Sequence, residues 1–270
     1  NSGIETQVGG NIGTPLLSLT EKARETGWTV AELSSFQLET IRDFRPNVGT
    51  CLNVTPNHMD RYDLFSDYAA AKHRLFMNQT PEDVAVLNAD DEVTADWAEG
   101  LRAHVSLFSV RKELDEGLFL RGRELVSRSG GKEKVLTTRD RIFLRGLHNV
   151  ENVLAVLSAG LACGASVDSM RETIRDFKGV EHRIEFVAEI EGVKFYNDSK
   201  ATSVDATLKA LEALSEEAGK TILILGGRGK NAPYAPLVPL LQKSPRALVL
   251  FGLDAANIQS QLNNHAEIIR

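Results

Sequence analysis

Hydrophobic residues recur along the first part of the chain in two alternating patterns. Short β-rich runs at 28–33, 48–54 and 84–87 predict strands. Between them, apolar residues at helical spacing predict helices such as the one over 66–77. Strands that alternate with helices are typical of a parallel sheet with helical crossovers. The pattern therefore predicts an open α/β sheet.

A more β-rich stretch follows over 104–136, where Gly130-Gly131 predicts a hairpin turn. We expect an antiparallel extension there. Helical spacing over 147–163 ends at Gly164, a usual C-terminal signal, and Asn149 is a plausible N-cap. A second helix is expected over 166–177.

The remaining residues predict a second open sheet. Two strands are expected on either side of Glu191-Gly192, and the elements after them are a helix over 204–214, a strand over 221–225, a helix over 236–242, a strand over 247–251 and a helix from Asp254. The predicted fold class is therefore α/β, with two open, mostly parallel sheet domains at 1–181 and 182–270. Because the chain begins with Asn1 and stops just after a strand-like 267–269, we expect both domains to be truncated.

Composition narrows the function. With 42% hydrophobic and 25% charged residues the chain has the balance of a globular protein, and no apolar run is long enough to span a bilayer. A net charge of −6 argues against a nucleic-acid partner, so small molecules are expected instead. Cys51 and Cys163 suggest neither a zinc site nor a disulfide framework. No secretion signal precedes the first strand, so a cytoplasmic location is expected.

Polar residues follow the predicted strands, where ligands bind in open α/β sheets. Glu32 and Ser34 follow one strand, Asn57 and His58 the next, and Asp90 and Asp91 a third. A carboxylate and an imidazole in one crevice suit Mg²⁺ if phosphates and water complete its shell. An equally good interpretation from position alone is that Glu32 caps a helix and that His58 is a turn residue. By position alone, Lys72 is a solvated surface lysine.

Two further segments suit a nucleotide. Asn149 and Asn152 lie one helical turn apart and offer carboxamides to a purine edge, although helix capping explains them equally well. The segment 197–202 joins a strand to a helix, where free N–H groups attract anions, but capping alone produces such a turn. Glycines at 226–229 would let backbone approach a ligand. The Walker A, nucleophile-elbow and dinucleotide-binding motifs are absent.

Across almost its whole length the chain resembles the Mur ligase family, and within it the ligases that add D-glutamate. The resemblance rests on an ordered series of blocks, which are GGNIG at 9–13, ELSSFQLE at 32–39, NVTPNHMDRY at 53–62, AAKHRLF around Lys72, LNADD at 87–91, HNVEN at 148–152, His182-Arg183 and NDSKAT at 197–202. The last block is the most discriminating, since sister ligases and folylpolyglutamate synthases differ there.

The resemblance implies a role for each matching residue. Glu32, His58 and a carbamylated Lys72 would hold Mg²⁺, with Lys72, His58 and Lys200 serving catalysis. ATP would be held by a set of four residues, which are Asn149, Asn152, Arg183 and Asp198. Asn11 and Ser34 would touch the muramoyl substrate, and Thr202, Lys200 and Lys230 would face D-glutamate.

The implied reaction joins D-glutamate to UDP-N-acetylmuramoyl-L-alanine through an acyl phosphate, in peptidoglycan synthesis, and a monomer is expected. Asn57 and Arg228 depart from the family pattern. The family's GxxGKST phosphate loop does not occur in these residues, so we expect no turnover from this chain alone. The alternatives are an inactive nucleotide-binding piece, or another amide ligase of the Mur or folylpolyglutamate synthase type.

Overall fold

The computed structural model describes residues 2–215, 220–229, 233–242, 245–263, 265 and 267–269. The chain divides into two compact units. Unit 1 comprises 1–54, 66–142 and 150–176, and unit 2 comprises 55–65, 143–149 and 177–270. The predicted boundary between 181 and 182 is not tested by this division and stays a prediction. No helix in the described part of the chain is long and apolar enough to cross a membrane.

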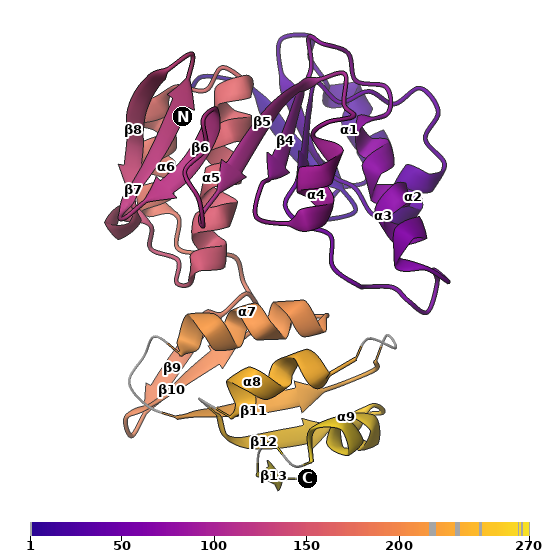
Figure 1. Ribbon diagram of the computed structural model, residues 1–270, viewed down its shortest axis with the longest axis vertical. Helices are drawn as coiled ribbons and strands as arrows, with labels where there is room; N and C mark the ends of the chain where they lie inside the picture. Colours follow the sequence, from indigo (N-terminus) through magenta and orange to yellow (C-terminus); the bar gives the residue numbers. More distant parts are fainter. Residues whose placement is uncertain are drawn as a thin grey trace. The chain divides into compact units, whose positions relative to one another are not determined.

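Unit 1 is built on a six-stranded sheet of order β3-β4-β5-β6-β7-β8, shown in Figure 1. Its strands are β3 (Val48–Cys51), β4 (Val84–Asn88), β5 (His104–Ser109), β6 (Gly117–Arg121), β7 (Glu124–Ser129) and β8 (Lys132–Thr138). Strands β3 to β6 pair in parallel, and β6, β7 and β8 pair antiparallel. The prediction of an antiparallel stretch from residue 104 was therefore wrong for β5, which continues the parallel sheet. The turn at Gly130-Gly131 is confirmed, with φ of +56° and +72°.

A separate parallel pair in unit 1 consists of β1 (Thr6–Gly10) and β2 (Trp28–Glu32). The short helix α1 (Leu16–Leu19) and the 3₁₀ turn η1 (Thr20–Lys22) connect them, and α2 (Ser35–Glu39) follows β2. Helix α2 begins where it does because Ser34 caps it: Gln37 N–H donates to Ser34 Oγ at 3.2 Å, and Ser34 N–H donates to Gln37 Oε1 at 2.9 Å. The predicted cap role of Glu32 was wrong, since Glu32 is the last residue of β2.

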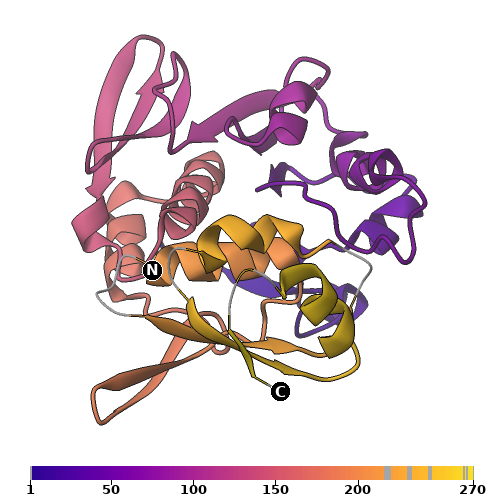
Figure 2. The ribbon, with the colours of Figure 1, turned by 60° about the horizontal axis from the view of Figure 1, so that its bottom comes forward.

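Helices complete unit 1, although Phe65 and residues 147–149, at the starts of two of them, are assigned to unit 2. They are α3 (Phe65–His73) with η2 (Arg74–Phe76), α4 (Glu92–Trp97), η3 (Arg139–Arg141), α5 (Leu147–Ala162) and α6 (Val167–Asp176). Figures 1 and 2 show α5 and α6 side by side against the strands β6–β8. The Arg171 guanidinium ties α6 to this sheet through the carbonyls of Val135 and Leu136. Because α5 begins at Leu147, its N-cap position is residue 146 and Asn149 lies inside the first turn, so the predicted N-cap was wrong by three positions.

Unit 2 contains a hairpin and a parallel sheet. The hairpin pairs β9 (Glu185–Ile190) with β10 (Val193–Asn197) around Glu191-Gly192, as predicted. The three-stranded sheet has the order β11-β12-β13, from β11 (Thr221–Gly226), β12 (Pro245–Phe251) and β13 (Ile268–Ile269). Helices α7 (Val204–Leu214), α8 (Val238–Leu241) after η4 (Ala235–Leu237), and α9 (Ala255–Leu262) pack with it. Their core is apolar and consists mainly of leucines, namely Leu211, Leu237, Leu241, Leu248, Leu250, Ile258 and Leu262. The α/β class with mostly parallel sheets is confirmed.

Candidate functional site

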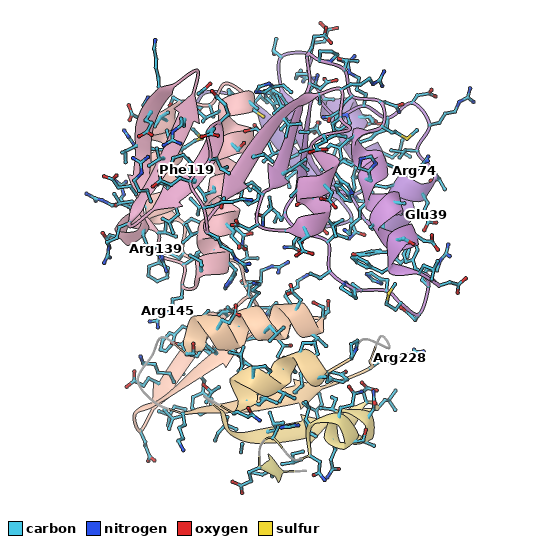
Figure 3. All side chains as sticks on the ribbon, viewed as in Figure 1. Glu39, Arg74, Phe119, Arg139, Arg145 and Arg228 are labelled. Atoms are coloured by element: carbon cyan, nitrogen blue, oxygen red, sulfur yellow. The ribbon has the colours of Figure 1, made fainter. Side chains whose placement is uncertain are left out.

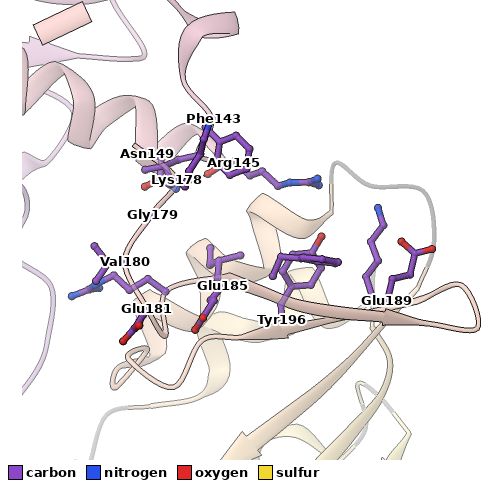
Figure 4. A pocket seen from close by; sticks show the side chains of 15 residues that line it. Phe143, Arg145, Asn149, Lys178, Gly179, Val180, Glu181, Glu185, Glu189 and Tyr196 are labelled. Atoms are coloured by element: carbon purple, nitrogen blue, oxygen red, sulfur yellow. Dashed lines mark hydrogen bonds between the residues drawn. The ribbon is translucent and has the colours of Figure 1, made fainter. Parts of the chain in front are cut away.

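Unit 2 contains a cavity of about 610 Å³ whose lining mixes aromatic, cationic and amide side chains. Figure 4 shows Phe143, Arg145, Asn149 and Lys178 on one wall, and residues of the β9–β10 hairpin on the other. This volume is in the range of small-molecule and cofactor sites, which span roughly 300–1,000 Å³. The cavity is therefore large enough for a nucleoside and part of its phosphates.

Two aromatic contacts shape this cavity. The Lys178 ammonium lies 4.5 Å from the ring centroid of Phe143, which is a cation–π contact. On the hairpin, the rings of Phe186 and Tyr196 meet edge to face, with centroids 5.7 Å apart. Such walls offer flat apolar surface to a planar ligand, and the cations Arg145, Arg183 and Lys194 in the same lining offer charge to an anion.

Of the four predicted nucleotide residues, Asn149 and Arg183 line this cavity, and Asn152 and Asp198 do not. The side-chain amide of Asn149 donates to the Arg145 carbonyl at 2.6 Å, which holds its carboxamide at the start of α5. Asn152 lies one turn further along the same helix. The structure thus brings together two residues that are distant in sequence, and leaves the other two out of the lining.

Asp198 has a structural partner in its own unit. Its Oδ1 accepts a hydrogen bond from the Ile184 backbone N–H at 3.0 Å. Burial raises the pKa of this carboxyl above its usual value, while the Ile184 bond and the nearby Arg183 charge act in the opposite direction. A half-buried carboxylate next to a cavity is a candidate acceptor for ligand hydroxyls. Its bond to Ile184 also means that it shapes the chain around Arg183.

The segment 197–202 lies between β10 and α7, as predicted. Lys200 and Thr202 are both exposed, and the Lys200 backbone N–H donates to the His182 carbonyl at 3.1 Å. Ser203 caps α7, because its Oγ accepts from Ala206 N–H at 3.2 Å. The cap of α7 is therefore Ser203, one residue beyond the segment for which capping was considered, and Lys200 and Thr202 lie exposed just before this helix.

In unit 1, Asn11 and Glu32 lie together at the carboxyl ends of β1 and β2. The Asn11 amide donates to Glu32 Oε1 at 3.0 Å, and Asn11 N–H donates to the Glu32 carbonyl at 2.7 Å. Both residues are exposed. A Cβ at Gly10 would collide with the Glu32 carbonyl, so only glycine permits this approach. The structure therefore joins a predicted substrate residue to a predicted metal ligand.

Lys72 is half-buried, so the interpretation as a solvated surface lysine was wrong. Its ammonium lies 5.2 Å from the Tyr68 ring centroid on α3. It is also close enough to Cys51, the last residue of β3, to act on the pKa of that thiol. Burial raises the pKa of Cys51 to about 11, and Lys72 partly offsets this. Lys72 therefore faces the carboxyl end of β3.

Other acids at this end of the sheet serve structural roles. Asp90 accepts from Ser109 Oγ at 2.6 Å and from Val110 N–H at 2.7 Å. Asp91 caps α4 by accepting from Thr94 N–H at 2.9 Å. Within the described residues no group of three or more His, Cys, Asp or Glu side chains is placed to hold a metal ion. Asp90 and Asp91 thus both accept hydrogen bonds from neighbouring parts of unit 1.

The remaining predicted residues have more limited descriptions. His58, which belongs to unit 2, has a φ of +57°, and its carbonyl accepts from the N–H groups of Arg61 and Tyr62, so it is a turn residue. Ser34 uses its hydroxyl in capping α2. Lys230 lies outside the described residues. The roles predicted for all three stay predictions.

A polar cluster at the carboxyl ends of β11 and β12 was missed from the sequence. Tyr234 donates to Asp254 Oδ2 at 2.5 Å, and Asp254 N–H donates to the Gly227 carbonyl at 3.0 Å. A Cβ at Gly229 would collide with the Asp254 carboxylate. These contacts hold the glycine loop that carries Arg228, labelled in Figure 3. Asp254 follows closely on a predicted strand, which was the available signal.

The cavity lining was also missed in part. Phe143, Lys178 and Tyr196 were not singled out as site residues, although they surround Asn149 and Arg183. The available signal was weak: β9 and β10 carry exposed aromatic residues without the alternation of a core strand. Sequence spacing alone could not have joined residue 143 to residue 196.

Comparisons with known proteins agree with this picture. Residues 4–160 match the model of the Mur ligase middle domain, and residues 182–270 match that of the Mur ligase, glutamate ligase domain. The UDP-N-acetylmuramoylalanine--D-glutamate ligase of Koribacter versatilis is 43% identical over 100% of this chain and 60% of its own length. The protein of the same name from Solibacter usitatus is 48% identical over 97% of the chain and 58% of its own length. The chain thus spans about three fifths of the curated relatives it matches.

Solved structures show the same fold. MurF from Acinetobacter baumannii superposes with a TM-score of 0.78 at 16% identity, over 99% of this chain and 61% of that one. MurF ligase from Thermotoga maritima, solved in complex with ADP, gives a TM-score of 0.72 at 17% identity, over 99% and 64%. At sequence identities this low, the structural similarity supports a shared fold and nothing further.

Proposed function

The chain belongs to the Mur ligase family, and on that premise we propose that it is the central and C-terminal part of the ATP-dependent ligase that joins D-glutamate to UDP-N-acetylmuramoyl-L-alanine in peptidoglycan synthesis. The observation that carries the proposal is the cavity of unit 2, whose lining includes Asn149 and Arg183 together with the aromatic residues Phe143 and Tyr196. The names of the relatives support the choice of amino acid.

ATP fits the chemistry of this cavity. Asn149 places its carboxamide in the lining of the cavity, where we propose that it faces the adenine edge, and Phe143 and Tyr196 offer flat surface. Arg183 supplies a guanidinium, which suits phosphate oxygens through paired hydrogen bonds. The carboxylates of Glu181 and Glu185 suit ribose hydroxyls rather than phosphates, so we place the ribose near these two residues.

Mg²⁺ requires oxygen ligands, usually one or two carboxylates with phosphate and water oxygens. The exposed Glu32 carboxylate provides one such ligand, and Asn11 holds it in place. A lysine ammonium repels Mg²⁺, so Lys72 fits as a ligand only when CO₂ has converted it to a carbamate. The cation would neutralise charge on the transferred phosphoryl group. The part predicted for His58 rests on the resemblance alone.

The proposed reaction has two steps. The terminal carboxylate of the muramoyl substrate attacks the γ-phosphorus of ATP and releases ADP, and the amine of D-glutamate then attacks the acyl phosphate and expels inorganic phosphate. Lys200 and Thr202, exposed before α7, would bind the carboxylates of D-glutamate together with Lys230. Holding amine and acyl carbon in near-attack geometry supplies much of the rate. We also propose a monomer, and a cytoplasmic location because ATP is supplied there.

The test is ADP release with UDP-N-acetylmuramoyl-L-alanine and a panel of amino acids. Two proteins are compared: the 270-residue chain, and the same chain joined to those portions of the Koribacter versatilis relative that it does not match. We expect turnover from the joined protein only, and only with D-glutamate. Turnover with L-alanine or a diamino acid instead would identify a different amide ligase. Binding of ATP without any turnover would favour the inactive nucleotide-binding alternative.

The role of Lys72 is tested in the joined protein. Lys72→Ala should lower the rate at least about 100-fold, which corresponds to about 2.7 kcal/mol of transition-state stabilisation. Added bicarbonate should not restore it. Arg74→Ala on the adjoining 3₁₀ turn is the matched control, because its guanidinium binds the Leu38 and Ile41 carbonyls and should affect stability rather than rate. An unchanged rate for Lys72→Ala would remove Lys72 from the site.

A further inference from the structure

The backbone on either side of Arg183 is left-handed. His182 has a φ of +67° and Ile184 a φ of +46°. Non-glycine residues rarely adopt this region, and for a β-branched side chain such as that of Ile184 it is a true outlier. Of the four non-glycine residues with positive φ in the described part of the chain, two therefore flank the guanidinium that lines the cavity. Strain of this kind persists only where surrounding contacts hold it.

Those contacts come from the beginning of the 197–202 segment and from Glu185. The Ile184 N–H donates to Asp198 Oδ1 at 3.0 Å, and the His182 N–H donates to Glu185 Oε2 at 2.8 Å. The His182 carbonyl accepts from Lys200 N–H at 3.1 Å. Each left-handed residue is thus held through its own backbone.

Asn197 adds a side-chain contact. Its Oδ1 accepts from Ser199 N–H at 3.1 Å, so its Nδ2 is the group that faces His182 Nδ1 at 2.8 Å. The same His182 Nδ1 lies 3.5 Å from Glu185 Oε2, so the ring is placed between Asn197 and Glu185. One amide therefore orders both the 197–199 turn and the His182 ring.

We propose that Asn197 and Asp198 are positioning residues that clamp the left-handed turn at 182–184 and so present Arg183 to the nucleotide. If the hydrogen bonds from Asn197 and Asp198 are lost, His182 and Ile184 can return to negative φ. The backbone at Arg183 then rotates, and its side chain points away from the cavity. Asp198 acts here through its bond to Ile184, in addition to any direct contact with ligand. The inference deepens the proposed function, because it assumes that a nucleotide occupies the cavity.

The test uses Asn197→Ala, in the full chain and in the joined protein. Amide hydrogen exchange of residues 182–185 is measured first without nucleotide. We expect exchange to be about 10-fold faster in the variant, because the exchange rate follows the opening equilibrium of the turn. The dissociation constant of MgATP, measured by titration calorimetry, should rise about 10-fold, as expected when a pre-organised guanidinium is released. Asp198→Asn, which keeps an acceptor for Ile184 N–H, should retain more affinity than Asp198→Ala.

A double variant separates the clamp from a general loss of structure. Glycine adopts the left-handed region without penalty, so Ile184→Gly should recover part of the MgATP affinity lost in Asn197→Ala. Because the Ile184 side chain also lines the cavity, Ile184→Gly alone is the reference against which recovery in the double variant is measured. Glu191→Gly, which relieves a left-handed residue at the hairpin tip, is the matched control and should leave affinity unchanged.

Unchanged exchange at 182–185 in Asn197→Ala would overturn the clamp whether or not ATP binds. Faster exchange with an unchanged MgATP dissociation constant would show that the turn has only a structural role, and would also overturn it. Failure of the unsubstituted protein to bind MgATP would instead count against the proposed function, while the exchange result would still decide whether the clamp exists.

Discussion

Two antiparallel hairpin regions in this chain both turn at a glycine-containing pair of residues, but their strands are buried to different extents. In unit 1, β6 and β7 are joined by residues 122–123 and β7 and β8 turn at Gly130-Gly131, whereas β9 and β10 of unit 2 turn at Glu191-Gly192. In the first region Phe119, Leu125 and Val126 are fully buried. In the second, Phe186 is 55% and Ile190 58% exposed. The first hairpins contribute to a core, whereas the second forms a wall of a cavity.

Charges follow the same division. On the first region, the Arg121 guanidinium donates to Glu113 at 3.0 Å and to Glu133 at 2.9 Å, and both pairs lie on the outer surface. On the second, the register partners Glu189 and Lys194 both line the cavity. Charges that satisfy each other stabilise a fold modestly. The first hairpins thus place their charges on an outer surface, whereas the second places part of its charge in the lining of a cavity.

The largest expected difference concerns the aromatic residues. Phe119→Ala should lower the free energy of unfolding of unit 1 by about 3–4 kcal/mol, because a fully buried ring leaves a cavity. Phe186→Ala should cost less than about 1 kcal/mol, since its ring is largely exposed, but should weaken MgATP binding. Urea unfolding followed by the fluorescence of Trp28 and Trp97, both in unit 1, measures the first effect. Equal losses of stability in Phe119→Ala and Phe186→Ala would contradict the distinction between hairpins that form a core and a hairpin that forms a cavity wall.

The next contrast compares two arginines. Arg183→Ala should weaken MgATP binding about 10- to 100-fold, as expected for about 1.5–3 kcal/mol from a charge-assisted hydrogen bond, with little change in thermal stability. Arg121→Ala should do the reverse, with unchanged MgATP affinity and a small loss of stability. Calorimetric titration and thermal unfolding are measured on both variants. An affinity loss in Arg121→Ala would show that the first region also serves the ligand.

The turns provide a smaller test. Gly131 has a φ of +72°, so Gly131→Ala should destabilise the first region by about 1 kcal/mol. Glu191 has a φ of +50° although it is not glycine, so Glu191→Gly should stabilise the second hairpin by up to about 1 kcal/mol. Hydrogen exchange of the flanking strands reports each local change. A destabilised hairpin in Glu191→Gly would mean that the Glu191 side chain matters more than its backbone.

The smallest effects should appear as opposite pH dependences. Hydrogen bonds from Arg121 and Arg128 lower the pKa of Glu133 to about 2. Its contribution to stability is therefore present above about pH 4.5, the ordinary pKa, and is lost as the pH falls toward 2. Glu133→Gln should be less stable than the unsubstituted protein at pH 7, and the difference should shrink with acidification.

Asp198 should show the opposite sign. Burial raises its pKa, so its ionised form opposes folding above that pKa, and the cost disappears as the carboxyl takes up a proton on acidification. Asp198→Asn should therefore be slightly more stable than the unsubstituted protein at pH 7, with a difference that vanishes below the ordinary value of 3.8. Urea unfolding between pH 3 and 7 checks both variants. The same sign for both carboxyls would break the comparison.

Local patterns in the sequence determined much of this protein. The strand at 84–88, the helix ending before Gly164 and the turns at Gly130-Gly131 and Glu191-Gly192 follow from hydrophobic spacing and from residues that permit particular backbone angles. The ordered motif blocks likewise identified the family, because short runs of polar residues after strands are visible without any folding.

Only the tertiary structure decided what those residues contact. It places β5 in the parallel sheet and pairs the carboxylates of Asp90 and Asp91 with backbone N–H groups. It also leaves Lys72 half-buried, and it brings Asn149 and Arg183 into the lining of one cavity. The left-handed Ile184 is also a product of contacts made 14 residues away. Such features depend on pairings between distant residues, whose free energies arise from packing and burial and leave no local periodic trace in the chain.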